Sequence, residues 1–192
     1  MPVLQDKAFY CDHIGTSESD QQDIMHFSVR NSRGEGLVNY IQRFALPDEK
    51  EGTMRTYLVR DNITSELVGY FSLKAGLVSF NETKTETGAD FDILPGIELA
   101  NFAVNEEYSR NHPNAKGLGA LIFKHLIVPI VHDVSGRIGV KVLYIFALPF
   151  EGLIQRYVQY GFMRLEAEHE ADVHNRLKPR YDEGCVFMYQ ML

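Results

Sequence analysis

Cysteines, long hydrophobic runs and basic clusters are all scarce in this sequence of 192 residues. The two cysteines, Cys11 and Cys185, lie near opposite ends of the chain, and the residues that follow Met1 include no long apolar stretch. We therefore expect free thiols in a reduced, cytoplasmic protein without an export signal. The longest apolar run, residues 126–131, contains Pro129 and is far shorter than the roughly 20 residues that cross a bilayer. The composition argues against membrane-spanning, collagen-like and disordered classes.

The charged residues form no basic stripe of the kind that a nucleic-acid-binding protein uses to neutralise phosphates. Lysine and arginine are scattered, and the nearest approach to a cluster, residues 176–180, is flanked by acidic side chains. The formal net charge is -7. Such an acidic surplus is typical of a protein that binds a small cationic molecule or peptide, or simply of a soluble one. We therefore expect an amine on a small molecule or peptide as the partner, with no nucleic acid and no membrane.

Hydropathy and turn residues predict one mixed α/β domain over residues 1–192. The first 50 residues are expected to be helical, with a second helix that begins at Leu37 and stops before Pro47. Residues 81–96 are polar and rich in turn formers, which indicates a loop or hairpin insertion. The other predicted elements are strands over 54–60, 67–80, 97–104, 140–148, from 162 and over 184–192, and helices over 117–134 and 151–160.

The helix predicted over 117–134 begins with two glycines, in the sequence Gly117-Leu118-Gly119-Ala120. Glycines let the backbone approach a ligand closely, and the unpaired amides of a first helical turn attract anions. One interpretation is therefore a phosphate or pyrophosphate site. A plain helix start is the other, because the segment lacks the lysine of a P-loop and the third glycine of a dinucleotide fingerprint. Further along, Pro129 must kink or restart this helix.

The segment after the apolar strand at 140–148 changes the balance between these interpretations. Its sequence, Arg156-Tyr157-Val158-Gln159-Tyr160-Gly161-Phe162, places a tyrosine four residues before Gly-Phe. Together with a strand that ends at Val104 and the glycine-bearing helix start at 114–120, it resembles the GNAT superfamily of acyl-CoA-dependent N-acyltransferases. The resemblance is specific over residues 97–165 and agrees in element order over 54–192. The link at 108–116 is longer than is usual in that family.

The resemblance implies a fold and a co-substrate. The fold would be a central mixed, mostly antiparallel sheet flanked by helices and splayed between the strands at 97–104 and 140–148. The co-substrate would be acetyl-CoA, with no metal. The backbone of three strand residues, Phe102, Ala103 and Val104, would pair with the pantetheine arm. The backbone amides of the helix start would hold the pyrophosphate: Ala115, Lys116, Gly117, Leu118, Gly119 and Ala120.

The resemblance also implies a general acid, Tyr157, which would protonate the departing thiolate. The alternative is an ordinary core tyrosine, because Tyr157 and Ile154 lie at helical spacing. Glu98 is the best candidate for the general base, since it lies in the strand that ends at Val104, where several relatives keep a glutamate. Its alternative is a solvated charge at a strand end.

The expected activity is an N-acetyltransferase that moves acetyl from acetyl-CoA to a primary amine by direct attack. The alternative is a non-catalytic acyl-CoA-binding regulatory protein, in which Glu98 and Tyr157 can be replaced without loss. Acylation of aminoacyl-tRNA by a toxin-like relative would require a basic face, and the net charge of -7 argues against it.

Alternating acidic residues near the C-terminus predict a strand with one charged face, made of Glu166, Glu168, Glu170, Asp172 and His174. This face either lines an acceptor site for a cation or is a solvated outer surface. A metal site at His169 and His174 is not expected, because the ligand spacing matches no known type. The last strand, around residues 187–191, is expected to be exposed and available for pairing with a second copy.

Overall fold

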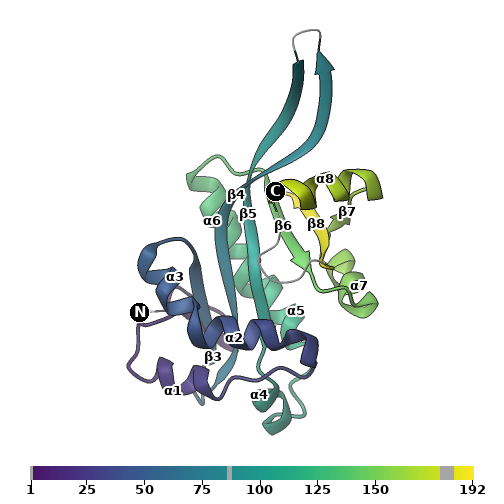
Figure 1. Ribbon diagram of the computed structural model, residues 1–192. Coiled ribbons are helices and arrows are strands. Elements are labelled where there is room, and N and C mark those ends of the chain that lie inside the picture. The colour runs from purple at the N-terminus through teal and green to yellow at the C-terminus, as the bar shows by residue number, and fades with distance from the viewer. Residues whose placement is uncertain (1, 86–87, 178–183) are drawn as a thin grey trace. The chain divides into compact units, whose positions relative to one another are not determined.

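The computed structural model describes residues 2–85, 88–177 and 184–192, and the chain forms two compact units. The first unit contains Met1–Lys74 and Ala100–Asp133, and the second contains Ala75–Leu99 and Val134–Leu192. Strands β4 (Leu67–Thr85) and β5 (Gly88–Val104) form a long hairpin and contribute to both units (Figure 1). The insertion expected at 81–96 is therefore a hairpin, with strand structure up to Thr85 and from Gly88 on.

The strands form a mixed sheet, as the sequence predicts. In the first unit the order is β1 (Leu4–Gln5), β2 (Phe9–His13), β3 (Arg55–Asp61), β4 and β5. In the second unit it is β5, β6 (Val142–Ala147), β8 (Val186–Met191) and β7 (Met163–Arg164). The β5–β6 pair is parallel, whereas β1–β2, β2–β3, β3–β4, β6–β8 and β7–β8 are antiparallel. The prediction of a mostly antiparallel mixed sheet flanked by helices is confirmed.

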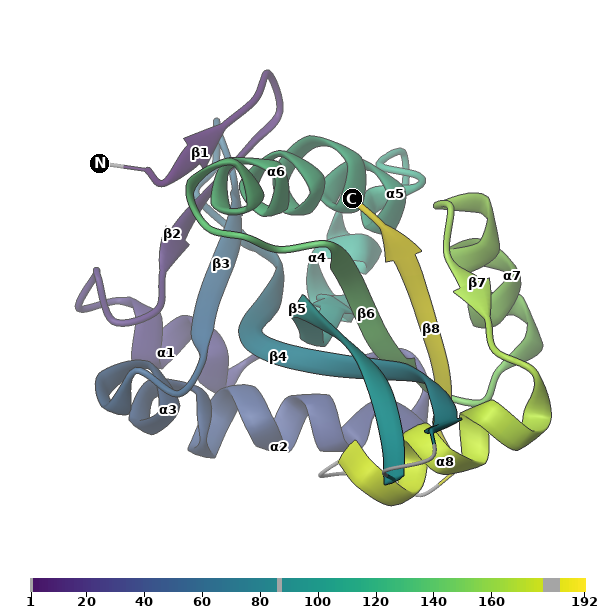
Figure 2. The ribbon, with the colours of Figure 1, turned by 90° about the horizontal axis from the view of Figure 1, so that it is seen from above.

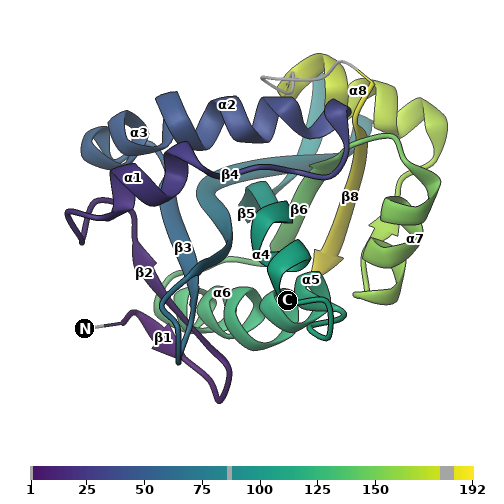
Figure 3. The ribbon, with the colours of Figure 1, turned by 90° about the horizontal axis from the view of Figure 1, so that it is seen from below.

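Helices cover both faces of the strands in the first unit. Helices α1 (Asp20–Met25), α2 (Glu35–Arg43) and α3 (Ala45–Glu51) lie on one face, and the helical segment that starts with α5 (Leu118–Ile122) lies on the other (Figures 2 and 3). The core under α1–α3 is apolar and includes fully buried side chains from α2, β3 and β4, namely Tyr40, Ile41, Leu58 and Tyr70. Burial of these large side chains is the main stabilising contribution in this unit.

The N-terminal segment corrects one prediction, because it begins with strands β1 and β2 rather than helices. In β2, Phe9 and Cys11 are buried and alternate with half-buried residues, which is the period of a strand. The strand forms because it pairs with β3, from Phe9↔Asp61 to His13↔Tyr57. Such long-range pairing overrides a weak local signal, so the sequence alone did not reveal it.

Two prolines are accommodated inside helical segments. Pro47 lies in the first turn of α3, where its missing N–H would have had no helical partner, so a new helix forms where the sequence predicted only an end. Pro129 lies one residue after the start of α6 (Val128–Arg137), which follows a π-helical turn at Phe123–Ile127. The sequence predicted a kink or a restart at Pro129; the structure shows continuous helical segments there, with a π-helical turn that shifts the hydrogen-bond register just before α6.

The whole helical segment Leu118–Arg137 has 20 residues and a mean hydropathy of 1.4 over its most apolar window, so by length and composition it could cross a membrane. Core helices of soluble proteins pass the same test. Here its apolar side, which includes Ile122, Leu126, Ile127 and Val131, is buried within the first unit.

The acidic segment of the second unit is helix α8 (Ala167–Leu177), not a strand. The predicted charged face therefore does not exist. In a strand every second side chain points to the same face, whereas in a helix, with 3.6 residues per turn, every second side chain points in a clearly different direction. Glu168 and Asp172 are exposed, whereas Glu170 is half-buried and lies 3.7 Å from His174 one turn later. Val173 on the same helix is buried in a core with Val78, Val142, Tyr144 and Phe187. In the part of the chain that the structure describes, no group of three His, Cys, Asp or Glu residues could hold a metal.

The outer edge of β8 is partly covered, which corrects the expected exposed edge. Strand β7 pairs with it at Met163↔Tyr189 and Arg164↔Met188. Beyond β7, the Glu170 carboxylate accepts the N–H of Phe187 at 3.0 Å. A side chain thus takes the hydrogen bond that a neighbouring strand would otherwise take.

Candidate functional site

The glycine segment expected to hold a pyrophosphate is the start of the long helical segment. Gly117 has φ +72°, in the left-handed region that favours glycine, and α5 begins at the next residue. The Leu118 side chain is buried and anchors this turn, whereas Lys116, Gly117 and Ala120 are exposed. The backbone amides of the first turn therefore face an accessible region that is favourable for an anion.

Within the first unit, the structure brings this helix to the end of β5, where the pantetheine strand was expected. Gly69 of β4 is the meeting point: a Cβ placed there would lie 2.6 Å from the Ala103 carbonyl oxygen and 3.3 Å from both the Val104 Cα and Ile122 Cδ1. Ile122 is the last residue of α5. The close packing of strand and helix thus requires glycine at position 69. Phe102 and Val104 are half-buried, and Ala103 is buried in the core.

In the second unit, β5 and β6 pair in parallel over a short stretch only. The register is Gly96↔Val142, Ile97↔Leu143 and Glu98↔Tyr144, and it ends there. Glu98, the expected base, is thus the last β5 residue of this register and is half-buried. Its Oε2 accepts a hydrogen bond from the Tyr144 hydroxyl at 3.4 Å.

Tyr144 is a residue that the sequence reasoning missed. Its side chain is 3% exposed. Burial, followed by the neighbouring Glu98 carboxylate, raises the pKa of Tyr144 above its ordinary value, so the hydroxyl remains a donor at neutral pH. The available signal was Gly76 inside the strand predicted over 67–80, because glycine in a strand often marks close approach of another group. Gly96 gave no such signal, because it lay at the end of the predicted insertion 81–96.

The expected general acid, Tyr157, lies on α7 (Glu151–Gln159) and is buried with 3% exposure. Its ring meets Phe162 edge-on at 5.4 Å between centroids, and Tyr160 edge-on at 6.0 Å. The Phe162 N–H donates to the Tyr157 carbonyl at 3.0 Å, across Gly161, whose φ is +92°. The Tyr-x-x-x-Gly-Phe pattern is therefore a helix end that folds back on its own tyrosine. Burial, and secondarily Tyr160, raises the pKa of Tyr157, which keeps its hydroxyl protonated at neutral pH.

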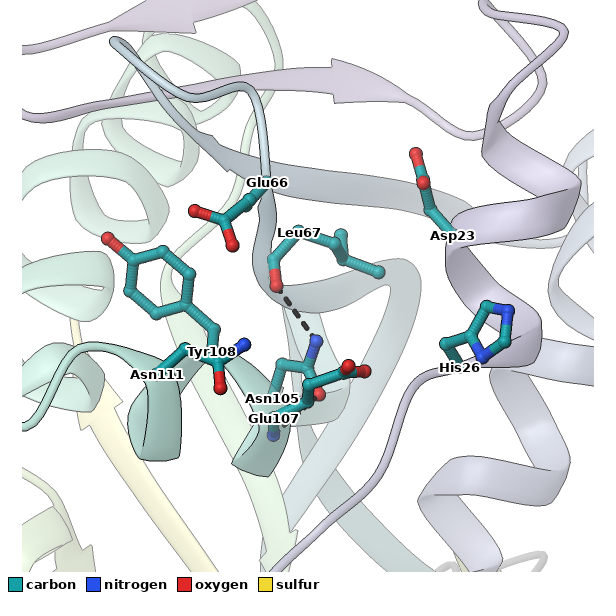
Figure 4. A pocket seen from close by; sticks show the side chains of 8 residues that line it. All are labelled: Asp23, His26, Glu66, Leu67, Asn105, Glu107, Tyr108 and Asn111. Carbon is teal, nitrogen blue, oxygen red and sulfur yellow. Dashed lines mark hydrogen bonds between the residues drawn. The ribbon is translucent and has the colours of Figure 1, made fainter.

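A separate polar pocket of about 220 Å³ lies in the first unit, beside α4 (Glu106–Asn111) (Figure 4). Three carboxylates line it, from Asp23, Glu66 and Glu107, and Asn105 Nδ2 donates to the Leu67 carbonyl at 2.9 Å. Its lining includes none of the predicted site residues. The carboxylates make it unsuited to a pyrophosphate.

Comparison with known proteins identifies the fold. No family model matches the chain. Among solved structures, a tyrosine-to-phenylalanine mutant of KacT is 17% identical, with TM-score 0.68 and coverage of 96% of this chain and 95% of that chain. A tyrosine-to-phenylalanine mutant of the AtaT toxin is 15% identical, with TM-score 0.66 and coverage of 95% and 89%. AtaT complexed with acetyl-methionyl-tRNAfMet is 16% identical, with TM-score 0.64 and coverage of 93% of both chains. These neighbours are GNAT-fold toxins, and the chain has the GNAT fold.

The same neighbours correct the expected partners. AtaT is seen with acetyl-methionyl-tRNAfMet, and with the C-terminus of the antitoxin AtaR and acetyl-CoA, while KacTA is seen with DNA. The expected partner, an amine on a small molecule or peptide with no nucleic acid, is therefore wrong: the neighbours are seen with tRNA, DNA and an antitoxin. Its physical basis was the net charge, which says nothing about local basic side chains.

Proposed function

We propose that this protein is an N-acetyltransferase that transfers the acetyl group of acetyl-CoA to the α-amino group of an aminoacyl-tRNA. The observation that carries the proposal is a buried tyrosine, Tyr157, in the Tyr-x-x-x-Gly-Phe helix end of a GNAT fold. Structures of AtaT with acetyl-CoA and with acetyl-methionyl-tRNAfMet support the choice of both substrates.

In this proposal two backbone segments bind acetyl-CoA. The amides of Lys116–Ala120 bind the pyrophosphate, helped by the open space around Gly117 and the dipole of the long helical segment. The Ala115 N–H, which was also expected to bind it, donates instead to the His112 carbonyl at 2.9 Å. The backbone of Phe102–Val104 binds the pantetheine arm as an added strand would. The β5–β6 register supports this role, because it ends at Glu98, before these residues.

Two side chains supply the proton transfers. Glu98 removes a proton from the substrate ammonium, and the neutral amine attacks the thioester carbonyl carbon. The C–S bond then breaks, and Tyr157 gives its proton to the departing thiolate. The new amide nitrogen loses its extra proton to solvent, Glu98 also releases its proton to solvent, and Tyr157 is reprotonated from solvent. A cysteine nucleophile is not needed. Cys11 and Cys185 are buried free thiols, and burial raises the pKa of Cys11 to about 12, so its reactive thiolate is suppressed.

An aminoacyl-tRNA also requires contacts to phosphates, which the acidic net charge seemed to exclude. Exposed basic side chains nevertheless lie within the glycine segment and on both sides of it in the sequence: Lys116 within it, and Arg110 and Lys124 beside it. Phosphate contacts need only a few such side chains, and their contribution depends on salt.

The test uses radiolabelled acetyl-CoA with aminoacylated tRNAs, uncharged tRNA and methionine methyl ester. We expect label on charged tRNA only, released as N-acetylamino acid when the ester bond is hydrolysed by mild alkali. Label on uncharged tRNA would contradict the α-amino acceptor. Acetyl-CoA binding in a calorimeter without transfer to any charged tRNA would overturn the enzyme and favour a non-catalytic acyl-CoA-binding protein.

A further inference from the structure

We propose that Tyr144 is a positioning residue that orients the Glu98 carboxylate through its hydroxyl, and that Gly76 and Gly96 are required because they leave room for the Tyr144 ring. The inference rests on the proposed function, since it assigns a residue to the same reaction. Every residue in it belongs to the second unit.

The Tyr144 ring is fixed from several sides. The Phe187 ring lies 5.8 Å away between centroids, and Phe146 meets Tyr144 edge-on at 6.3 Å. Val173 of α8 and Val78 of β4 are buried in the same core. Because the ring cannot turn freely in such packing, its hydroxyl keeps one direction, toward Glu98 Oε2 at 3.4 Å.

The two glycines show that this direction is built into the strands. A Cβ at Gly76 would overlap the Tyr144 hydroxyl, and a Cβ at Gly96 would lie 3.1 Å from Cε1 of the same ring. Any side chain at position 76 would therefore displace the hydroxyl from its place. Glycine in a strand interior normally lowers stability. We infer that two glycines lie beside this tyrosine because larger side chains would prevent the contact between its hydroxyl and the Glu98 carboxylate.

A hydrogen bond to the charged form of a carboxylate favours that form and fixes which oxygen is turned toward the substrate. Glu98 would thus be held ionised and oriented before the amine arrives. Other titratable groups on the elements packed here are Tyr189 of β8, Glu170 and His174 of α8, the further α8 residues Glu168, His169 and Asp172, and Arg176 of α8, which donates to Ser79 of β4 at 3.4 Å. The His174 ring contacts Phe146, with 5.4 Å between centroids.

The experiment measures kcat, the KM for charged tRNA and the pH dependence of kcat/KM for Tyr144→Phe. We expect kcat to fall about tenfold with little change in KM, and the acidic limb of the profile to move up by about one pH unit, because a bond to the carboxylate is lost. The matched control is Tyr189→Phe, which removes a hydroxyl from the residue that pairs with Tyr144 on β8. A wild-type profile for Tyr144→Phe, or the same change in both variants, overturns the proposal.

Gly76→Ala gives a second test that leaves Tyr144 itself unchanged. It should reduce kcat about as much as Tyr144→Phe in the wild-type background but have much less effect when added to Tyr144→Phe, because the displaced hydroxyl is already absent. Additive losses in the double variant overturn the proposal. Failure of the proposed function is recognised separately: the wild-type protein would then transfer no acetyl group, or Glu98→Gln would be fully active.

Discussion

At the scale of single residues, the proposed reaction uses two tyrosines whose burial keeps them protonated at neutral pH. Tyr157 is nearly inaccessible, and its ring contacts other aromatic side chains. Tyr144 is equally buried, but its hydroxyl has a carboxylate partner. We therefore propose different roles for them: Tyr157 as the proton donor, and Tyr144 as the residue that orients the base.

Replacing Tyr157 by phenylalanine should lower kcat by about a hundredfold while leaving the KM for acetyl-CoA nearly unchanged, because only the transferable proton is removed. Steady-state release of free thiol at several acetyl-CoA concentrations measures both constants. Tyr160→Phe is the control, since its ring contacts Tyr157 on the same helix end. If Tyr157→Phe keeps wild-type kcat, Tyr157 is a core residue and not the acid.

The family resemblance pointed to Tyr157, whose role stays a prediction, whereas no pattern in the sequence pointed to Tyr144, and the difference is physical. Tyr157 belongs to a local pattern, because its Gly161 turn and Phe162 contact lie within five residues. Tyr144 acquires its role from Glu98 and Gly76, which are distant in sequence and meet it only in the folded sheet. A single sequence shows local patterns and conceals such long-range ones.

At the scale of whole elements, helices and strands with a clear local sequence pattern were predicted correctly, whereas elements that depend on long-range contacts were not. β3, β6 and α7 were predictable, because their apolar residues follow strand or helix periods and have clear ends. α8 was predicted as a strand because its acidic residues alternate, yet a helix satisfies that segment by burying Val173 and pairing Glu170 with His174. β2 was missed because its stability comes from pairing with β3.

Helix α8 closes the edge of β8 through Glu170, and this makes a testable contribution to stability. Glu170→Ala removes the acceptor of the fully buried Phe187 N–H and should lower the free energy of unfolding by about 2 kcal/mol. Urea denaturation measures the change, and hydrogen exchange should show faster exchange of the Phe187 amide. Glu168→Ala, an exposed change on the same helix, should have almost no effect. Equal losses in the two variants would show that the acidic charge in the first turn of α8, not the edge contact, is responsible.

Helix α4 forms the first part of the long link at 108–116, up to Asn111, and is held to the β3–β4 turn by a small polar network. The Tyr108 hydroxyl donates to Asp61 Oδ2 at 2.6 Å, and His112 Nε2 lies 2.8 Å from Glu66 Oε2. Burial alone would raise the pKa of Asp61, but hydrogen bonds from Tyr108 and from the Ile63 and Thr64 amides outweigh it and lower that pKa. The anchor is therefore strongest with Asp61 ionised.

This gives a pH-dependent prediction for Tyr108→Phe. Because the folded pKa of Asp61 is depressed, its contribution is present above the unfolded value of about 3.9 and is lost as pH falls through the folded value. Tyr108→Phe should therefore cost about 1 kcal/mol at neutral pH and clearly less in strongly acidic solution. Urea denaturation of both proteins at the two pH values measures it. A cost that is the same at both would show that Tyr108 acts through packing alone.

At the scale of the whole molecule, net charge was the observation that misled the sequence analysis. A total of -7 is a sum over all surfaces, whereas binding to a tRNA depends on the side chains that meet its phosphates. The fold shared with AtaT, not the composition, is what directs attention to a nucleic-acid substrate. An acidic protein with few phosphate contacts is expected to release its tRNA readily, and its repulsion from the tRNA is itself screened by salt.

The salt dependence of the reaction therefore tests the acceptor at this scale. If about three phosphates are contacted, kcat/KM for charged tRNA should fall about twentyfold between about 50 and about 200 mM salt, whereas kcat/KM for acetyl-CoA at saturating tRNA should change little. Initial rates at several salt concentrations give the slope. Lys116 is exposed in the glycine segment, so its side chain can reach a phosphate of the tRNA. Lys116→Gln should then raise the KM for charged tRNA. It should also make the plot of log kcat/KM against log salt concentration shallower, by the equivalent of about one phosphate contact. A flat salt profile for charged tRNA would mean that the protein recognises the aminoacyl end without its phosphates, and the acceptor would then have to be a smaller aminoacyl ester.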